Sequence, residues 1–143
     1  MRIVIGCDHA GYDMKEKVKD YLINKNFNII DVGTDSNKSV NYPSFGHEIG
    51  KKVVENKVYK GIAICGSGIG ISIAANKIKG IRAALCTSVE HAEMSRKHND
   101  ANILALGSRM TSEKDIFNIV DVWLSTKFEA GRHLDRVNMI EYE

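Results

Sequence analysis

Five short runs of mainly β-branched and aliphatic residues alternate along this chain with stretches in which apolar residues recur at helical spacing. The predicted strands cover residues 2–7, 27–32, 60–65, 81–86 and 103–106. Between the first two strands, Met14, Val18 and Leu22 form one helical stripe, and the last predicted helix covers residues 132–140. Strands that alternate with helices form right-handed βαβ crossovers. The pattern therefore predicts an α/β fold with a mostly parallel five-stranded sheet and helices on both faces.

Two element boundaries are predicted from individual residues. The polar segment 34–43 has the composition of a loop. Either Thr111 or Ser112 can cap the helix that follows the fifth strand, because a hydroxyl can accept a hydrogen bond from a free N–H group of the first turn.

The composition fits one globular domain over residues 1–143. Hydrophobic residues make up 43% of the chain and charged residues 27%, a balance that argues against disorder. The formal net charge of +2 is too weak to indicate a nucleic-acid partner, so basic residues that matter must act locally. No apolar run has the length of a signal peptide or a membrane span, so we expect a cytoplasmic protein without a membrane partner.

Polar and reactive residues follow the predicted strands at the points where they end. The segments are Asp8-His9 after the first strand, Cys65-Gly66-Ser67 at the third, Thr87-Ser88 after the fourth and Ser108-Arg109 after the fifth. The carboxyl ends of parallel strands meet at one edge of a sheet, where open α/β folds bind ligands. Loops generally begin with polar residues, which accounts for Thr87 and Ser88 but less well for an acid, a histidine and a thiol.

The segment Gly66-Ser67-Gly68-Ile69-Gly70, placed between a strand and a helix, is typical of an anion-binding turn. Glycines let the backbone approach a ligand closely, although tight packing would also account for them. Three known loops fit poorly. A Walker loop needs a lysine, a dinucleotide fingerprint needs GxGxxG with a later acidic residue, and a cysteine-phosphatase loop needs an arginine where this chain has Ile71.

The three cysteines, Cys7, Cys65 and Cys86, lack the spacing of a metal site, and their odd number indicates free thiols. Cys65 directly precedes the glycine loop, whose N–H groups can stabilise a thiolate and a developing oxyanion. A base beside such donors is what proton removal next to a carbonyl requires. The spacing leaves open whether Cys65 is reactive or inert, whereas we interpret Cys7 and Cys86 as inert buried thiols.

His98 and an arginine pair each have a functional and a structural interpretation. His98 ends a predicted helix, where it can simply interact with the helix dipole. Arg132 and Arg136 lie at i and i+4 on the last predicted helix and so share a face. Such a pair can bind a phosphate dianion, but it is more often a solvated surface, which Asp135 would partly neutralise.

Taken together, these motifs resemble the ribose-5-phosphate isomerase B family. The matching segments are Asp8-His9-Ala10-Gly11, residues 65–70, residues 98–102, Gly107-Ser108-Arg109, and Arg132-His133 with Arg136. They span nearly the whole chain in the expected order, and their combination is specific although each segment alone is weak. The related isomerases of galactose 6-phosphate and allose 6-phosphate share the pattern broadly.

The resemblance implies a Rossmann-like three-layer fold, a homodimer with active sites at the subunit interface, and neither metal nor cofactor. It implies a single sugar-phosphate isomerase domain over residues 1–143. The reaction would be the interconversion of D-ribose 5-phosphate and D-ribulose 5-phosphate, a step of pentose phosphate metabolism, through an enediolate. Which subunit supplies each residue, and whether dimers pair into tetramers, stays open.

The resemblance also implies a role for each matching residue. Cys65 would move a proton between C1 and C2 as the base, His98 would help to open the furanose ring, and Ser67 would carry a proton between O1 and O2. Asp8 would contact the sugar hydroxyls, and the phosphate would be bound by His9, Arg132 and Arg136. The enediolate would be bound by the backbone of Gly66, Ser67, Gly68, Ile69 and Gly70. Asn99 and Arg109 would contact the rest of the substrate.

Two positions distinguish this chain within the family pattern. Ser67 stands where some members have threonine, and it keeps the hydroxyl. Another branch replaces the cysteine by a glutamate just after the glycine loop, where this chain has Ile71, which cannot act as a base. The chain therefore resembles the cysteine-dependent branch.

Other functions remain open at the level of the residues. A non-catalytic sensor of phosphosugars or nucleotides would use the glycine loop and the arginines without needing a base. A cysteine phosphatase fits less well because its arginine is missing. Preference among ribose, allose and galactose phosphates depends on the depth of the pocket, which one sequence does not give.

Overall fold

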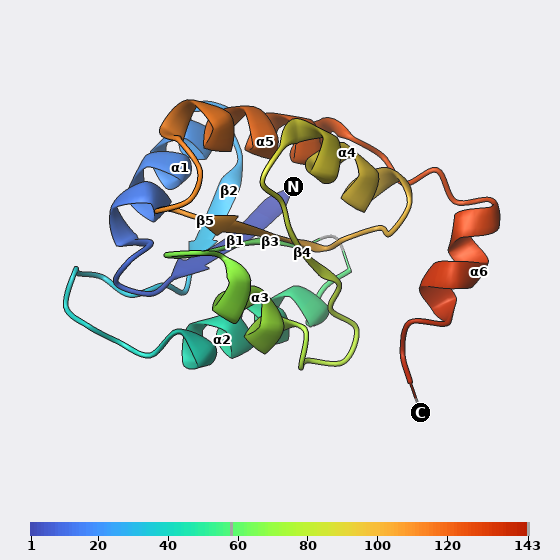
Figure 1. The fold of residues 1–143 in the computed structure, drawn as a ribbon, viewed down its shortest axis with the longest axis horizontal. Helices are drawn as coiled ribbons and strands as arrows, with labels where there is room; N and C mark the ends of the chain where they lie inside the picture. The colour runs from blue at the N-terminus through green and yellow to red at the C-terminus, as the bar shows by residue number, and fades with distance from the viewer. Residues whose placement is uncertain (58, 143) are drawn as a thin grey trace.

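The computed structural model describes residues 1–57 and 59–142, which fold into three layers around one sheet (Figure 1). The sheet has the strand order β2-β1-β3-β5-β4, and every pairing in it is parallel. The strands are β1 (Arg2–Cys7), β2 (Asn28–Asp31), β3 (Lys60–Cys65), β4 (Ala83–Leu85) and β5 (Ile103–Gly107). The predicted α/β class and the five-stranded sheet are confirmed.

The helices cover both faces of the sheet. They are α1 (Tyr12–Asn24), α2 (Tyr42–Val54), α3 (Ile69–Ala75), α4 (Val89–Lys97), α5 (Glu113–Ser125) and α6 (Arg132–Asn138). Helices α1, α4 and α5 lie on one face and α2 and α3 on the other, while α6 stands apart at one end (Figure 1). No helix within the described residues is both long and apolar enough to cross a membrane.

Side chains alternate along the strands, so each central strand contributes to two hydrophobic cores. In β3, Ile62 and Ile64 pack with Trp123 of α5 in the core beneath α1, α4 and α5. Ala63 and Cys65 of the same strand belong to the core beneath α2 and α3. Burial of each large aliphatic side chain stabilises the fold by roughly 1.5–3 kcal/mol. The two cores therefore fix which face of the sheet each strand residue occupies.

Hydroxyl caps define the starts of two helices. The Oγ atom of Ser112 accepts a hydrogen bond from the N–H group of Asp115 at 3.2 Å, so Ser112 rather than Thr111 caps α5. Ser88 caps α4 in the same way, through the N–H group of His91 at 3.2 Å. Both caps satisfy N–H groups that have no partner within their own helix.

Several elements differ in length from the sequence expectation, and α6 and β2 are each two residues shorter than predicted. The predicted loop 34–43 ends early, because Tyr42 and Pro43 already form the first turn of α2. Proline is well suited to that turn, since its missing N–H group would have had no helical partner. Strand β4 has only three residues, whereas the apolar run predicted a strand over 81–86.

The strand order reverses direction at β1. The chain places β2 on one side of β1 and β3 on the other, and open parallel sheets bind ligands in the crevice outside the carboxyl ends at such a point. Cys7 pairs with Ile64, and Cys65 pairs with Gly107, so β1, β3 and β5 end at nearly the same level. The loops after these three strands are therefore the ones that can form a site together.

Candidate active site

A pocket of about 380 Å³ opens beyond the carboxyl ends of β1, β3 and β5, and we name it the Cys65 pocket. It is lined by Asp8, His9, Ala10, Tyr42, Cys65, Gly66, Ser67, Gly70, Arg109 and Met110. The structure thus brings together the predicted residues of three separate strand ends. An acid, an imidazole, a thiol, a hydroxyl and a guanidinium group all border one small space.

Cys65 ends β3 with its side chain on the face that carries α2 and α3. The residue is 5% exposed, and its side chain borders the Cys65 pocket. Its Sγ atom accepts a hydrogen bond from the backbone N–H group of Gly68 at 3.1 Å. This contact fixes the position of the sulfur next to the glycine loop. Cys65 therefore has both access to a ligand and a backbone donor at its sulfur.

Neither of the other two thiols borders the Cys65 pocket. Cys7 ends the neighbouring strand on the opposite face, in the core beneath α1 and α5, and burial raises its pKa to about 12. Cys86 is also buried, and burial raises its pKa to about 11. Both side chains stay protonated near neutral pH, in agreement with their interpretation as inert thiols.

The glycine loop is tightly enclosed. Gly68 has a left-handed φ of 78°, and a Cβ atom there would lie 2.6 Å from Cδ1 of Leu85 and 2.8 Å from the carbonyl carbon of Leu106. A Cβ atom on Gly70 would lie 2.6 Å from the ring of Tyr42. Because backbone and ring atoms occupy this space, the loop holds its position, and with it the N–H group that faces Cys65.

The two residues after β1 are held by backbone groups. Asp8 is 6% exposed, and its Oδ1 atom accepts a hydrogen bond from the N–H group of Gly11 at 3.1 Å. Nδ1 of His9 lies 3.1 Å from the backbone nitrogen of Val40 and 3.2 Å from its oxygen. In the tautomer that accepts from the Val40 N–H group, Nε2 carries the proton and can donate it to an anion.

The segment after β5 is joined to the segment after β3. The N–H groups of Ser108 and Arg109 donate to the carbonyl oxygens of Cys65 and Gly66, each at 2.9 Å. The Ser108 hydroxyl donates to the carbonyl oxygen of Ala10 at 2.7 Å, and this bond joins the loop after β1 to the other two segments. These bonds hold the exposed Arg109 side chain at the edge of the Cys65 pocket.

The remaining lining residues include one predicted side chain and two that were missed. Ser67 Oγ accepts a hydrogen bond from the N–H group of Ile69 at 3.1 Å, so its own proton is available to a ligand. Tyr42 was assigned to a loop, and no motif in the sequence marks it as a lining residue. Met110 was also missed, although its position next to Arg109 was a signal that could have found it.

His98 lies outside the Cys65 pocket. It follows α4, and its ring stacks on that of His133 in α6, with centroids 4.2 Å apart and planes inclined by 14°. Nε2 of His98 lies 3.6 Å from Oε1 of Glu129. Burial and the adjacent His98 ring lower the pKa of His133. The stack therefore favours the neutral form of His133.

The same three side chains are the candidate ligands for a metal ion. The ligand atoms of His98, Glu129 and His133 all lie within 4.8 Å of one another. The two histidine rings of this group are also stacked on each other, so their nitrogen lone pairs lie in nearly parallel planes.

The predicted arginine pair also lies apart from Cys65. Arg132 and Arg136 are exposed on α6, whose His133 is buried, so the predicted shared helix face is confirmed. Asn99 is exposed and borders two shallow hollows beside β4. None of these residues lines the Cys65 pocket of its own chain. One chain therefore divides the predicted site residues into two groups.

Comparison with known proteins identifies relatives over nearly the full length. The family described as "Ribose/Galactose Isomerase" matches residues 3–140. Ribose-5-phosphate isomerase B of Escherichia coli is 43% identical over 139 residues, covering 97% of this chain and 93% of the relative.

Solved structures of relatives match this chain over nearly its full length as well. Ribose-5-phosphate isomerase B of Clostridium thermocellum superposes with a TM-score of 0.96 at 51% identity, covering 98% of this chain and 95% of that one. The Mycoplasma genitalium enzyme of the same name, with bound ribulose-5-phosphate, superposes with a TM-score of 0.94 at 39% identity, covering 97% of this chain and 93% of that one.

The three thiols should differ in their reaction with iodoacetamide. At pH 8 we expect Cys65 to be alkylated at least about tenfold faster than the other two, because thiols with a pKa of 11 or more are almost entirely protonated at that pH. Mass spectrometry of proteolytic peptides after timed exposure measures the three rates. In guanidinium chloride all three should react at similar rates, and faster labelling of Cys7 or Cys86 in the native protein would contradict the assignment.

Proposed function

This chain belongs to the ribose/galactose isomerase family and is an isomerase, and from that premise we propose that it interconverts D-ribose 5-phosphate and D-ribulose 5-phosphate. The observation that carries the proposal is the position of Cys65, which borders a pocket with Sγ against the Gly68 N–H group. A relative of the same fold holds ribulose-5-phosphate. In this proposal residues 1–143 act as one cytoplasmic isomerase domain that uses no metal and no cofactor.

Cys65 is the base on carbon in the proposed reaction. Its thiolate removes the proton from C2 of the open-chain aldose, and the electron pair forms a C1–C2 double bond while O1 becomes an oxyanion. The thiol then returns the proton to C1. O2 loses its proton as it becomes the ketone oxygen, and O1 gains one. One side chain on one face of the substrate is therefore sufficient for both transfers between carbon atoms.

The glycine loop stabilises the enediolate in this proposal. Its backbone N–H groups are fixed by the packing around Gly68 and Gly70, so they need no rearrangement when the oxyanion forms. One donor of this kind typically changes the rate by about 10²–10³-fold. The Ser67 hydroxyl carries the proton from O2 to O1, a role supported by its place in the pocket and its free proton.

The residues beside the loop bind the rest of the sugar phosphate. Asp8 orients the sugar hydroxyls, and its fixed Oδ1 atom supports that role. His9 donates from Nε2 to the phosphate while Val40 holds its other nitrogen. Arg109 contributes a guanidinium group at the edge of the pocket, where planar donors suit an anionic substrate.

A second copy of the chain completes the site in this proposal. His98 opens the furanose ring, Arg132 and Arg136 bind the phosphate and Asn99 contacts the substrate, each from the partner subunit. Their separation from the Cys65 pocket of their own chain supports a shared site. A symmetric homodimer supplies two such sites, because each chain gives one group of residues to its partner.

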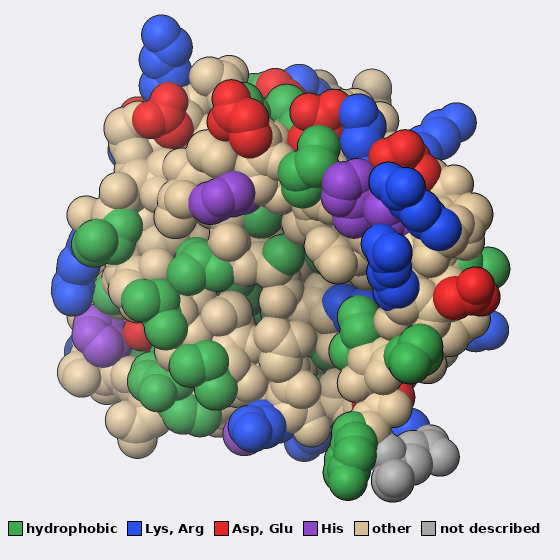
Figure 2. All heavy atoms as spheres, turned by 45° about the vertical axis from the view of Figure 1, so that its right-hand side comes forward, with side chains coloured by type: hydrophobic (Ala, Val, Ile, Leu, Met, Phe, Trp, Pro, Cys, Tyr) green, Lys and Arg blue, Asp and Glu red, His purple; other side chains and the backbone are tan. Residues whose placement is uncertain are grey.

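The surface around these residues supports the dimer. Figure 2 shows apolar side chains gathered on the face that carries α6, close to a group of histidine and arginine side chains. The exposed apolar residues of α3, α4 and the region of α6 are Ile69, Ile73, Met94, Leu134, Met139 and Ile140. An apolar patch beside polar binding residues is typical of an interface between subunits.

A panel of aldose phosphates tests the proposed reaction. We expect ribose 5-phosphate to give a higher kcat/KM than allose 6-phosphate or galactose 6-phosphate, because relatives of similar length are named for that substrate. Nuclear magnetic resonance in D₂O measures both the ketose formed and the deuterium that the base exchanges into C1.

Phosphate release from p-nitrophenyl phosphate serves as the control for the panel, and none is expected. Faster conversion of a hexose phosphate would overturn the substrate assignment. Binding of every sugar without conversion would instead identify a sensor.

Mixed dimers test the shared site. Cys65→Ala and His98→Ala homodimers should each be inactive, whereas a mixture that is unfolded and refolded together should recover about a quarter of the wild-type activity. Half of the refolded dimers are then mixed, and one of the two sites in each mixed dimer contains both native residues. The assay is ribulose 5-phosphate formation before and after refolding.

The matched control for the mixed dimers combines Cys65→Ala with Ser67→Ala. Cys65 and Ser67 both belong to the Cys65 pocket of the same chain. Each site in a mixed dimer therefore lacks one of these two side chains. This pair should recover no more activity than its homodimers have alone. Recovery in the control pair, or none in the test pair, would mean that the site is not divided between subunits in the proposed way.

A further inference from the structure

A second pocket lies at the opposite edge of the sheet from the Cys65 pocket, and we name it the amino-edge pocket. Its volume is about 410 Å³, within the range typical of small-molecule sites. Basic side chains line it together with the apolar side chains of Val53, Val54 and Tyr59. Lys60 begins β3, Arg82 directly precedes β4 and Asn102 directly precedes β5, so the pocket lies where these parallel strands start.

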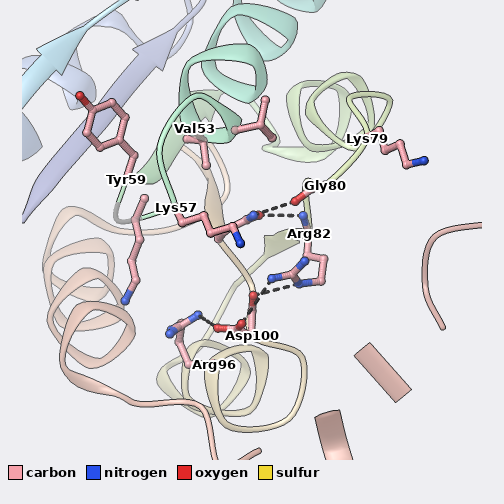
Figure 3. A pocket seen from close by; sticks show the side chains of 11 residues that line it. Val53, Lys57, Tyr59, Lys79, Gly80, Arg82, Arg96 and Asp100 are labelled. Carbon is pink, nitrogen blue, oxygen red and sulfur yellow. Dashed lines mark hydrogen bonds and ion pairs between the residues drawn. The ribbon is translucent and has the colours of Figure 1, made fainter. Parts of the chain in front are cut away.

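The charge of the amino-edge pocket is strongly unbalanced. Lysine and arginine supply five of its lining side chains, and Asp100 supplies the single carboxylate. Asp100 is already engaged, because its Oδ1 lies 2.9 Å from Nη1 of Arg96 and its Oδ2 lies 3.4 Å from Nη2 of Arg82. Figure 3 shows the carboxylate between the two guanidinium groups, with Lys57 above them and Lys79 extending away. With five basic side chains and one shared carboxylate, the lining carries a net positive charge.

Lys60 is the most informative of these cations. It makes no ion pair within residues 1–57 and 59–142, and its Nζ atom lies over the ring of Trp123, 5.7 Å from the centroid. Arg96 lies over the same ring, also at 5.7 Å. Burial lowers the pKa of Lys60, the Arg96 charge lowers it further, and Asp100 opposes both. A half-buried ammonium group next to a guanidinium group is stabilised by an anion from outside the chain.

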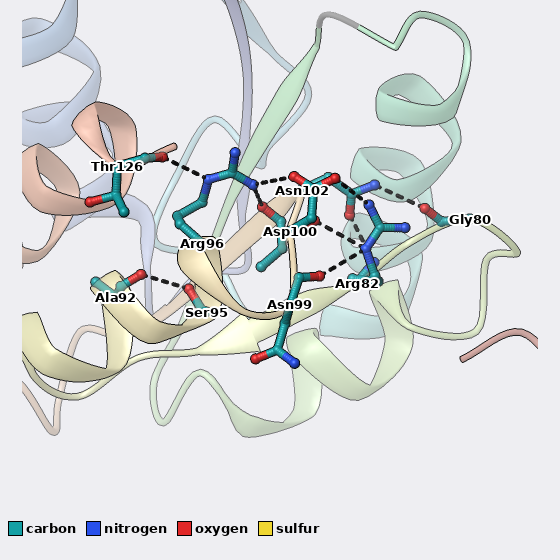
Figure 4. A network of polar contacts seen from close by, with 10 residues as sticks. Gly80, Arg82, Ala92, Ser95, Arg96, Asn99, Asp100, Asn102 and Thr126 are labelled. Atoms are coloured by element: carbon teal, nitrogen blue, oxygen red, sulfur yellow. Dashed lines mark hydrogen bonds and ion pairs between the residues drawn. The ribbon is translucent and has the colours of Figure 1, made fainter. Parts of the chain in front are cut away.

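Both guanidinium groups are held in place before any ligand binds. Nε of Arg96 donates to the carbonyl oxygen of Thr126, and its Nη1 donates to that of Ala101 at 2.7 Å. Nε of Arg82 donates to the carbonyl oxygens of Asn99 and Asp100, at 3.1 and 3.0 Å (Figure 4). Binding would therefore require little reordering of either side chain, which is an advantage for affinity.

Each guanidinium group still has donors to offer. Nη1 of Arg82 and Nη2 of Arg96 have no hydrogen-bond partner in the part of the chain that the structure describes. Val53, Val54 and Tyr59 form an apolar wall on another side of the pocket. The pocket thus combines fixed planar donors and ammonium groups with a surface for carbon atoms, a combination that suits a phosphorylated organic molecule.

We propose that the amino-edge pocket binds a small organic polyanion bearing phosphate groups, at a site separate from that of the sugar phosphate. The phosphate groups lie among Lys57, Lys60 and the free donors of Arg82 and Arg96. The organic part lies against Tyr59 and the two valines. The proposed isomerase reaction uses none of these side chains, so the inference stands independently of it.

Isothermal titration calorimetry with inorganic pyrophosphate tests this site. The full chain carrying Arg132→Ala and Arg136→Ala removes the arginines proposed for the substrate phosphate, and we expect it to bind one pyrophosphate per chain. Adding Lys57→Gln and Lys60→Gln should weaken that binding at least about tenfold, the usual effect of removing charge-assisted hydrogen bonds. Adding Lys114→Gln instead, an exposed residue of α5 outside the pocket, should change the Kd less than about twofold.

The alternatives give different results. If pyrophosphate binds the wild-type chain but not the arginine variant, the anion occupies the substrate site and the proposal is wrong. Equal weakening by Lys114→Gln would mean that pyrophosphate is attracted nonspecifically to a basic surface, which would overturn the proposal. Absence of binding at millimolar pyrophosphate would also overturn the proposal. Melting temperatures identify any variant that fails to fold, and Lys57→Gln alone, on an exposed side chain, then provides the same comparison with a smaller expected loss.

Discussion

The alternation of side chains at the carboxyl end of β3 is the constraint on which the candidate site depends. The parallel ladder holds Cys65 opposite Gly107, while Cys7 of β1 lies opposite Ile64. Successive residues face opposite layers, so position 65 faces α2 and α3 and position 64 faces the other core. A shift of one residue would turn the thiol into the core beneath α1, α4 and α5 and turn an isoleucine toward the glycine loop. The hydrogen bond from Gly68 to the sulfur therefore depends on the register of the whole sheet.

The two edges of the sheet are suited to anions in different ways. At the carboxyl edge, backbone N–H groups of an enclosed loop supply donors that carry no net charge, and Asp8 lies close by. At the amino edge, side chains of lysine and arginine gather around one shared carboxylate. The overall charge of +2 conceals this uneven distribution, because acidic side chains elsewhere on the surface offset the basic cluster. The net charge of the chain therefore does not indicate where on its surface a small anion would bind.

The sequence predicted what depends on local chemistry and missed what depends on distant packing. The strands, a hydroxyl cap at Thr111 or Ser112, and the loop after Cys65 follow from residues that lie within a few positions of one another. The strand order, the contact of Tyr42 with Gly70 and the stacking of His98 on His133 depend on segments far apart in the chain. The amino-edge pocket was not predicted, because its lining comes from the end of α2, the starts of three strands, α4 and the loops between them.

Turnover of Cys65→Ala compared with Cys7→Ala tests the central claim most directly. Both changes remove a buried thiol from the last residue of a central strand, but only Cys65 borders the pocket. The account predicts that kcat for ribose 5-phosphate falls about 10²–10⁴-fold in Cys65→Ala, with little change in binding, and stays near the wild-type value in Cys7→Ala. Near-normal turnover in Cys65→Ala would contradict the assignment of this sulfur as the base.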